Sequence, residues 1–538
     1  MNSELKNIDS KDHQKRRVFV IGLDGATFDY IMPWVKQNKL PFIGELIRGG
    51  VYCNMESTIP PTTPPAWVSL ITGKNPGKHG IYDFFKKDIN NISRLVDFTD
   101  IKAKCIWDYL SEKNKKSIIV NFPLTYPPPE INGIVIPGEL TPREKFKSYP
   151  SNIIKEIEKE IGEYMVFPDN KILKYPEKNI NKIFKIVDNL KNVTLYLMNK
   201  YDYDLFILQF QITDTIFHII KDEKKILKVY QAVDKSISEI FQNLDQNTIV
   251  FIVSDHGMTS IKKEIYINKF LIDLGLLQIK SGQNKNYTHP LSHLECGKSN
   301  RKPFLEKKSL NFLITGGLTV EKINHFFPFF RFFGKLIPEN LKRFLPHSTI
   351  DYNNSKAYLY SSTACGIVIN AKTVNEYEKI RNLIIKELSK LEDPENGEKI
   401  IEKIFKREEI YFGPYLNKAP DVLFLTKNCK YIIKSNYYNR KLVSKSSDLR
   451  GHNMNAIFIA YGSDIKKNTR IDDIKIFDIA PTILYILDLK IPRDMDGRVL
   501  KEIFNECSDL AKREVSYTEI NEKERIKYNI ERIKKYRV

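Results

Sequence analysis

The chain has 538 residues, of which 42% are hydrophobic and 12% aromatic, and its formal net charge is +19. This length and composition predict a folded protein with more than one structural unit and exclude a disordered chain. The six cysteines are scattered without a C-x-x-C pair, which argues against a disulfide framework or a thiolate metal site. The lysines are spread along the whole chain, so the charge favours a solvated surface over a specific nucleic-acid-binding face.

Residues 1–16 are polar and charged, which predicts a flexible N-terminal arm and no secretory signal. The sequence contains no uninterrupted apolar run long enough to cross a bilayer. We therefore expect a cytoplasmic protein, with peripheral contact at the inner membrane face as the alternative.

Apolar runs alternate with helical patterns along much of the chain. The apolar runs cover residues 17–22, 117–121, 205–211, 248–254 and 456–461, and helical patterns cover 182–199 and 226–244. This alternation predicts an α/β fold with a mostly parallel central sheet sandwiched by helices. Ligands of such sheets bind beyond the carboxyl ends of the strands.

The pattern changes after residue 269. Segments 357–370, 374–391, 401–409 and 421–425 predict a small strand-helix-strand-strand unit. We therefore expect residues 17–269 and 431–510 to form the core, residues 270–430 an inserted α+β cap, and residues 511–538 a charged C-terminal extension.

The segment Phe326–Pro346 is rich in aromatic and basic residues, with six phenylalanines within eight positions. It has two interpretations, a part of the cap that buries its phenylalanines or an interfacial segment on an anionic membrane. We favour the cap, because Pro328, Gly334 and Pro338 interrupt any long amphipathic helix.

Carboxylates and imidazoles occur at or near the ends of several predicted strands. Each of them alone also fits an ordinary turn or surface contact, but together they indicate a site for two metal ions. Carboxylate and imidazole ligands without thiolates suit Zn²⁺ or Mn²⁺. These residues are Asp24, Asp214 with His218 at i, i+4, Asp255 with His256, and His452 between Gly451 and Asn453.

The run Thr63–Gly73 predicts a helix with Thr63 at its N-cap, prolines in the first turn and Gly73 closing it. This arrangement places the Thr63 hydroxyl, free backbone N–H groups and the positive end of the helix dipole together, which suits a phosphoryl group. An ordinary capped helix is the alternative interpretation.

In these motifs the chain resembles the alkaline phosphatase superfamily, and most closely its type I phosphodiesterase/nucleotide pyrophosphatase branch, over about 17–260 and 445–500. The resemblance implies hydrolysis of a small phosphoester through a phosphothreonine on Thr63. It also implies two metal ions, the first held by Asp24, Thr63, Asp255 and His256 and the second by Asp214, His218 and His452. Asp478 and Pro492–Leu500 resemble a C-terminal signature with a structural role.

Two departures from the branch bear on the substrate. Phe84 stands where branch members with nucleotide substrates carry Asn, which leaves open diester or monoester preference and nucleotide recognition. Thr63–Trp67 lacks the Cys or Ser and the Arg of the sulfatase maturation motif. The alternatives are a phosphomonoesterase, a phosphonate hydrolase or a phosphotransferase of the same superfamily. A non-enzyme alternative is a basic nucleic-acid- or membrane-binding protein on a degenerate scaffold.

Overall fold

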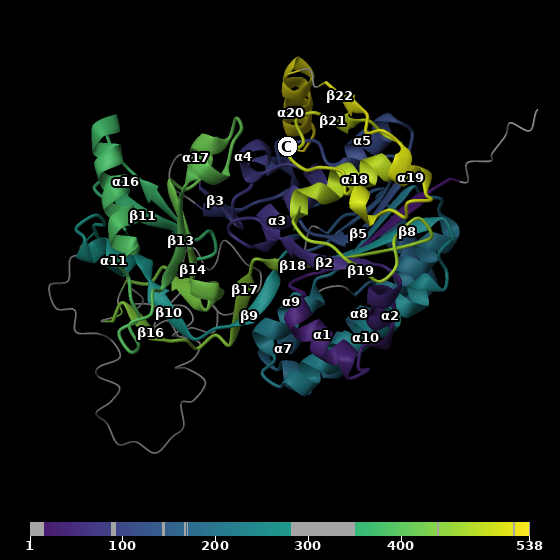
Figure 1. The fold of residues 1–538 in the computed structure, drawn as a ribbon, viewed down its shortest axis with the longest axis horizontal. Helices are drawn as coiled ribbons and strands as arrows, with labels where there is room; N and C mark the ends of the chain where they lie inside the picture. Colours follow the sequence, from purple (N-terminus) through teal and green to yellow (C-terminus); the bar gives the residue numbers. More distant parts are fainter. Residues whose placement is uncertain are drawn as a thin grey trace, which may run out of the picture.

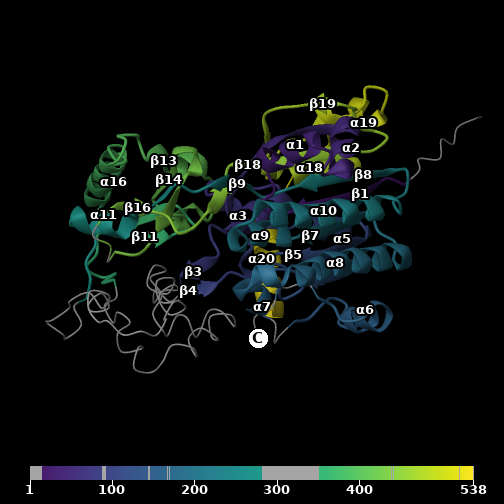
Figure 2. The ribbon, with the colours of Figure 1, turned by 90° about the horizontal axis from the view of Figure 1, so that it is seen from below.

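The structure is a computed structural model, and it describes residues 15–87, 93–142, 146–165, 168, 170–280, 350–437, 439, 441–519 and 522–536. Residues 1–14 of the predicted arm and the whole segment Phe326–Pro346 lie outside the described residues. In the described part, no helix has the length and apolar character needed to cross a membrane. A helix-covered sheet and a smaller unit lie side by side (Figures 1 and 2).

The large unit is built on a nine-stranded sheet. Its strands follow the order β19 (Thr469–Arg470), β2 (Val51–Glu56), β18 (Asn455–Tyr461), β8 (Thr248–Val253), β1 (Arg17–Leu23), β7 (Leu205–Phe210), β5 (Ser117–Phe122) and β6 (Gly133–Pro137), with β20 (Ile474–Lys475) beside β2. The pairs from β8 through β6 are parallel, whereas β18 is antiparallel to both of its neighbours. The predicted fold class is confirmed.

Helices cover both faces of this sheet because its central strands are apolar on both sides. One apolar layer includes α1 (Phe28–Lys36), α2 (Pro41–Gly49), α6 (Ile153–Ile161), α8 (Ile180–Lys200), α9 (Ile212–Ile219) and α10 (Glu223–Phe241). The opposite layer includes α3 (Thr63–Thr72), α5 (Ile106–Glu112) and α18 (Ile479–Ile486). Strands β1, β7 and β8 are therefore shielded from water on both faces, which fixes the positions of the loops that follow them.

The smaller unit has its own apolar core, which runs from Ile265 to Val443. It contains a sheet of β11 (Ala357–Ser361), β12 (Gly366–Ile369), β14 (Val422–Thr426) and β13 (Ile401–Lys406), packed with α16 (Val374–Leu388). A second sheet of β15 (Tyr431–Lys434), β10 (Lys263–Tyr266) and β16 (Val443–Lys445) adjoins α11 (Ile267–Asp273). The division at 270 and 430 stays a prediction.

One element of the smaller unit differs from the prediction. Segment 357–370 forms a β-hairpin rather than one strand, so the order is strand-strand-helix-strand-strand. The turn between β11 and β12 includes Cys365 at φ 47°, a left-handed conformation that reverses the chain. No glycine or proline marks this turn before Gly366, so the sequence pattern did not reveal it.

The two units contact each other beside α4 (Pro76–His79). Asn75 donates from its side-chain amide to the carbonyl of Phe412, at 3.0 Å, and accepts from the Phe412 amide at 3.2 Å. The Tyr82 hydroxyl donates to the carbonyl of Tyr415 at 2.7 Å, and the rings of Tyr82 and Tyr411 lie 5.3 Å apart. The loop after α17 (Arg407–Ile410) therefore packs against the segment that follows α3.

The C-terminal part returns to the large unit. Asp478 accepts from the backbone amides of Lys475 and Arg498, at 2.8 and 2.9 Å, which ties the start of α18 to the signature stretch 492–500. The predicted extension contains β22 (Tyr517–Thr518), which pairs with β21 (Ile491–Pro492), and the helix α20 (Glu522–Tyr536). Tyr528 of α20 donates to Asp108 at 2.7 Å, so the extension packs on the core.

Candidate active site

The sheet register brings three of the predicted segments to one edge. Gly22 of β1 pairs with Gln209 of β7 and with Val253 of β8, so these three strands end level with one another. Asp24 follows β1, the pair Asp255 and His256 follows β8, and α9 with Asp214 and His218 begins after β7. Close approach is helped by Gly25, where an added Cβ would lie 2.9 Å from Asp214 Oδ1.

His452 reaches this edge through a separate two-stranded ribbon. Strand β17 (Arg450–Asn453) pairs antiparallel with β9 (Gly257–Ser260), which places His452 opposite Met258. The His452 ring consequently stacks on the His256 ring, with centroids 3.6 Å apart and planes at 17°. Any side chain at Gly257 would collide with Asn453, whose Oδ1 lies 2.3 Å from an added Cβ. A residue 196 positions away from His256 thus joins the site.

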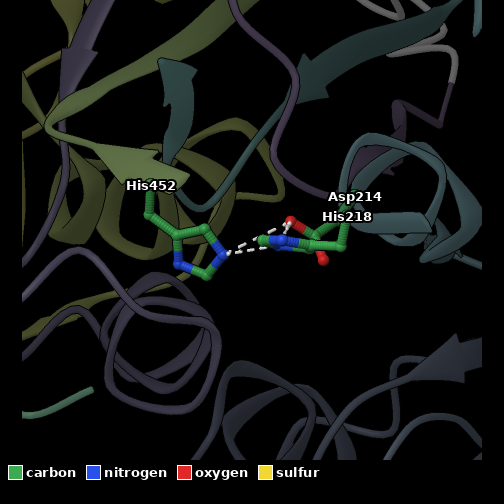
Figure 3. Close-up of side chains that lie close together, drawn as sticks. All are labelled: Asp214, His218 and His452. Atoms are coloured by element: carbon green, nitrogen blue, oxygen red, sulfur yellow. Dashed lines mark hydrogen bonds and ion pairs between the residues drawn. The ribbon is translucent and has the colours of Figure 1, made fainter. Parts of the chain in front are cut away.

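Asp214, His218 and His452 form what we call the outer set. Oδ1 of Asp214 lies 3.2 Å from His218 Nε2 and 3.4 Å from His452 Nε2. The two Nε2 atoms are themselves 3.2 Å apart, and all three side chains point toward one another (Figure 3). His218 is the most open of the three, with 39% of its side chain exposed. These three atoms could ligate one ion.

Asp24, Thr63, Asp255 and His256 form the inner set, and all four are buried. His256 Nε2 lies 3.2 Å from Asp255 Oδ2, 3.8 Å from Asp24 Oδ1 and 3.4 Å from Thr63 Oγ1. Ligand atoms of Asp24, Asp214 and His256 also lie within 4.8 Å of one another, so Asp214 adjoins both sets.

Backbone carbonyls orient both stacked imidazoles. His256 Nδ1 lies 3.1 Å from the carbonyl of Gly257, and His452 Nδ1 lies 3.1 Å from the carbonyl of Pro61. A proton on Nδ1 satisfies each carbonyl and leaves Nε2 with a free lone pair directed into the site. This is the tautomer that a metal-binding histidine requires.

The two sets differ in their electrostatics. Burial, together with the neighbouring carboxylates, raises the pKa of Asp24 well above its ordinary value, and burial does the same to the pKa of Asp255. Burial also lowers the pKa of His256 well below its ordinary value. Burial likewise favours the neutral form of Asp214, but His218 and His452 outweigh it and hold the pKa of Asp214 well below its usual range. The inner carboxylates therefore need an additional positive charge to ionise.

Divalent metal ions fit these residues. Among the described residues, buried Asp24 Oδ1 and Asp255 Oδ2 have no hydrogen-bond donor, which is costly for a carboxylate unless a cation is bound. The donor atoms are carboxylate oxygens and imidazole nitrogens, a set that suits Zn²⁺ or Mn²⁺. The geometry is thus consistent with the ligand assignment, which stays a prediction.

The prediction for Thr63 needs one correction. The helix begins at Thr63, but its N-cap is Thr62, because Ala66 N donates to the Thr62 carbonyl at 3.1 Å. Pro64 and Pro65 have no N–H, so the first turn offers one amide hydrogen, that of Thr63, rather than several. Thr63 nevertheless has its hydroxyl beside His256, within 3.4 Å of Nε2.

A further carboxylate at the site, Glu139, is not among the residues predicted from the sequence. It follows β6, and it interacts electrostatically with Asp24, Asp214 and His218. Burial and the charge of Asp214 raise the pKa of Glu139 to about 7. The signal that could have revealed it is the run Gly133–Pro137, an apolar strand followed by Gly138 and an acidic residue.

Two neutral side chains beside Asp24 were also missed. The indole of Trp67 and the amide of Gln209 donate to Asp24 Oδ2, at 3.1 and 2.7 Å. Gln209 could have been noticed as a polar residue inside an otherwise apolar strand.

Several known proteins are similar to this chain in sequence or in fold. The mouse ectonucleotide pyrophosphatase/phosphodiesterase family member 1 is 24% identical over an alignment of 326 residues, and the match covers 54% of this chain. The chain spans only 32% of the length of that relative. The structure of phosphonoacetate hydrolase from Sinorhizobium meliloti superposes with a TM-score of 0.52 at 12% identity, covering 88% of this chain and 95% of the other. Human ectonucleotide pyrophosphatase/phosphodiesterase 5 gives a TM-score of 0.49 at 14% identity, covering 91% and 100%.

One family matches more than half of the sequence. The matched residues are 18–309. They contain α3, α9, β8 and all of β1 except Arg17, with the residues that follow these elements. The chain therefore belongs to the type I phosphodiesterase/nucleotide pyrophosphatase family.

Proposed function

We propose that this protein is a metal-dependent phosphoester hydrolase of the phosphodiesterase type, with Thr63 as its nucleophile. The observation that carries the proposal is the position of the Thr63 hydroxyl. Thr63 is the first residue of α3 and is 3% exposed, and its hydroxyl lies 3.4 Å from His256 Nε2 within a cluster of carboxylates. A hydroxyl beside such a cluster is a nucleophile that bound cations can activate.

Two ions, Zn²⁺ or Mn²⁺, would be held by the two sets, with Asp24, Asp255, His256 and Thr63 around one and Asp214, His218 and His452 around the other. When bound, they would lower the pKa of the Thr63 hydroxyl and neutralise the non-bridging oxygens of the substrate. The protein orients the ligands through the backbone contacts of His256 and His452, so little reorganisation is needed during the reaction.

The chemistry proposed for Thr63 has two displacements. The Thr63 hydroxyl gives its proton to solvent, and its oxygen forms a bond to phosphorus while the bond to the leaving-group oxygen breaks. The leaving group departs with that electron pair. Water then attacks the phosphothreonine, which releases the phosphoryl product and returns the hydroxyl to Thr63. The positive end of α3 and the single free amide of its first turn would stabilise the added negative charge.

We propose the substrate class of the family, but one residue, Phe84, differs from the members that hydrolyse nucleotides. Phe84 occupies the position of an Asn in nucleotide-hydrolysing members and offers no polar atom from its side chain. A phosphonate ester or a phosphomonoester is accordingly a competing substrate that the assay must include. We further propose a cytoplasmic location and a small-molecule phosphoester rather than a nucleic acid as partner.

The test is a substrate panel on the full chain loaded with Zn²⁺ or Mn²⁺. It contains bis-p-nitrophenyl phosphate, p-nitrophenyl phosphate, a phenylphosphonate ester and dinucleotides. We expect turnover of the diesters, and acid quenching should trap on a peptide that contains Thr63 a phosphoryl group that still carries the second ester of the substrate. Preferential turnover of the monoester or phosphonate would replace the diesterase assignment. A protein that contains no divalent ion and is inert on the whole panel would favour the non-enzyme alternative.

A further inference from the structure

The two oxygens of Asp24 have different environments. Oδ2 accepts from Trp67 Nε1 at 3.1 Å and from Gln209 Nε2 at 2.7 Å. Oδ1 lies on the side of the inner set, 3.8 Å from His256 Nε2, and has no hydrogen-bond donor among the residues that the structure describes. The carboxylate is thus held through one oxygen and presents the other to the site.

Both donors are neutral and are fixed by their own packing. Trp67 and Gln209 have no exposed surface, and the Trp67 ring packs edge-on against Phe122 at 5.2 Å. Gly22 of β1 makes room for both, because an added Cβ would lie 2.7 Å from Trp67 Cη2 and 3.0 Å from Gln209 Cγ. Neutral donors orient a carboxylate without cancelling its charge, whereas Lys or Arg would compete with a metal ion.

The hydrogen bond from Trp67 also connects Asp24 with Thr63, the proposed nucleophile. Trp67 lies four residues after Thr63 on α3, so the two side chains share one face of the helix. A hydrogen bond from Trp67 to Asp24 therefore fixes how α3, and with it Thr63, sits relative to this carboxylate.

We propose that Trp67 and Gln209 are positioning residues, a neutral clamp that limits Asp24 to ligation of a metal ion through Oδ1 and sets the distance from that ion to Thr63. The inference rests on the proposed function for the role of Asp24 as a ligand. It adds two residues to the site, and both act through Asp24 rather than on the substrate.

The test compares the metal affinity of three single variants with that of the wild-type chain. Trp67→Phe and Gln209→Met each remove one donor and keep most of the side-chain volume. Trp107→Phe is the matched control: Trp107 is equally buried, packs edge-on against the same Phe122 at 6.3 Å, and its Nε1 has no hydrogen-bond partner among the described residues. Zn²⁺ affinity is measured by competition with a chelator, and the visible spectrum is recorded after loading with Co²⁺.

We expect Trp67→Phe and Gln209→Met each to weaken the binding of one Zn²⁺ by about tenfold or more, as loss of a ligand's supporting hydrogen bond does elsewhere. The Co²⁺ spectrum should shift, whereas Trp107→Phe should change neither quantity. Equal loss of affinity in Trp107→Phe, or unchanged affinity and spectrum in the two clamp variants, would overturn the clamp. If Trp67→Phe does not fold, Gln209→Met against Trp107→Phe decides the question.

These outcomes separate the clamp from the proposed function. A wild-type chain that binds two ions and hydrolyses diesters, but whose clamp variants bind them equally well, contradicts the clamp alone. A wild-type chain that binds no divalent ion contradicts both the clamp and the proposed function.

Discussion

The inner and outer sets differ in what the protein itself supplies to balance charge. In the inner set, the buried carboxylates Asp24 and Asp255 face one imidazole, His256, whose own protonation is opposed by burial. In the outer set, a single carboxylate, Asp214, has two imidazoles within 3.4 Å, and one of them is well exposed. The carboxylate of the outer set is therefore balanced by imidazoles of the protein itself, whereas the inner carboxyl groups ionise only when a cation is added.

This difference predicts distinct behaviour of the two ions. The inner ion should bind more tightly and exchange more slowly, because its carboxylates have no positively charged partner from the protein and are shielded from water. The outer ion should be the first removed by a chelator. If stepwise chelation removes the inner ion first, the prediction that the inner ion binds more tightly is wrong.

The largest expected effect is that of the nucleophile. Thr63→Ala should lower turnover by roughly a thousandfold or more while both ions remain bound, because the other ligands of the inner set are intact. Thr62→Ala is the matched control, since Thr62 is also buried but its hydroxyl has no hydrogen-bond partner in the described structure. Steady-state kinetics and metal analysis measure both. A dead Thr62→Ala with an active Thr63→Ala would place the nucleophile one residue earlier.

The next effect separates the two sets by stoichiometry. His452→Ala should reduce bound metal from about two ions to nearer one, since the inner set keeps its own ligands. Asp255→Asn, which preserves shape and removes a charge, should instead remove the inner ion. Metal analysis after gel filtration measures both variants. If His452→Ala keeps both ions and full activity, His452 is not a ligand.

A smaller effect should follow from loosening the outer set without touching a ligand. Arg450, two residues before His452, donates to the carbonyl of Ile220 at the end of α9, at 3.1 Å, and so ties β17 to the helix of His218. Arg450→Lys should weaken the binding of the outer ion by about tenfold, as the loss of a ligand's supporting contact does elsewhere. The affinity for the inner ion should not change. Arg381→Lys is the control, because Arg381 is as buried but lies in the smaller unit. Equal affinities of the two variants for the outer ion would show that the contact between Arg450 and Ile220 does not support this site.

The residues at strand ends could be predicted because their position is set by local pattern and parallel pairing. Apolar runs fixed β1, β7 and β8, and parallel strands must end at the same edge, so Asp24, Asp214 and Asp255 had to meet there. His452 was harder to predict, since its place depends on the pairing of β17 with β9 across nearly 200 residues. Only the resemblance to a family suggested that contact.

The features that could not be predicted depend on single tertiary contacts. The shift of the N-cap from Thr63 to Thr62 is decided by one hydrogen bond from Ala66. Glu139 was missed because β6 is a short edge strand with few distinguishing residues. Trp67 carries no sign in the sequence that its indole would face Asp24, since a tryptophan on a buried helix face usually indicates packing alone.

The last prediction tests the support beneath the inner set. His79 is fully buried, and its Nε2 lies 3.0 Å from the hydroxyl of Ser69 on α3, while its Nδ1 accepts from the amide of Ile81 at 3.2 Å. Protonation would place a hydrogen on Nδ1, facing that N–H group. Burial accordingly lowers the pKa of His79 from 6.5 to about 3.

The sign of the resulting pH dependence follows from linkage. Above pH 6.5 His79 is neutral in both the folded and the unfolded chain, and its contribution to stability is fully present. Below that pH the unfolded chain gains a proton that the folded protein does not, so the free energy of unfolding falls by roughly 1 kcal/mol per pH unit toward the folded pKa.

His79→Gln should remove this pH-dependent component of the free energy of unfolding. Ser69→Ala, which loses a hydrogen bond worth about 1 kcal/mol at every pH, should keep it. Urea midpoints measured between about pH 4 and 7 separate the two variants. Parallel pH curves for wild type and His79→Gln would show that His79 has the same pKa in the folded and the unfolded chain, which would contradict the prediction.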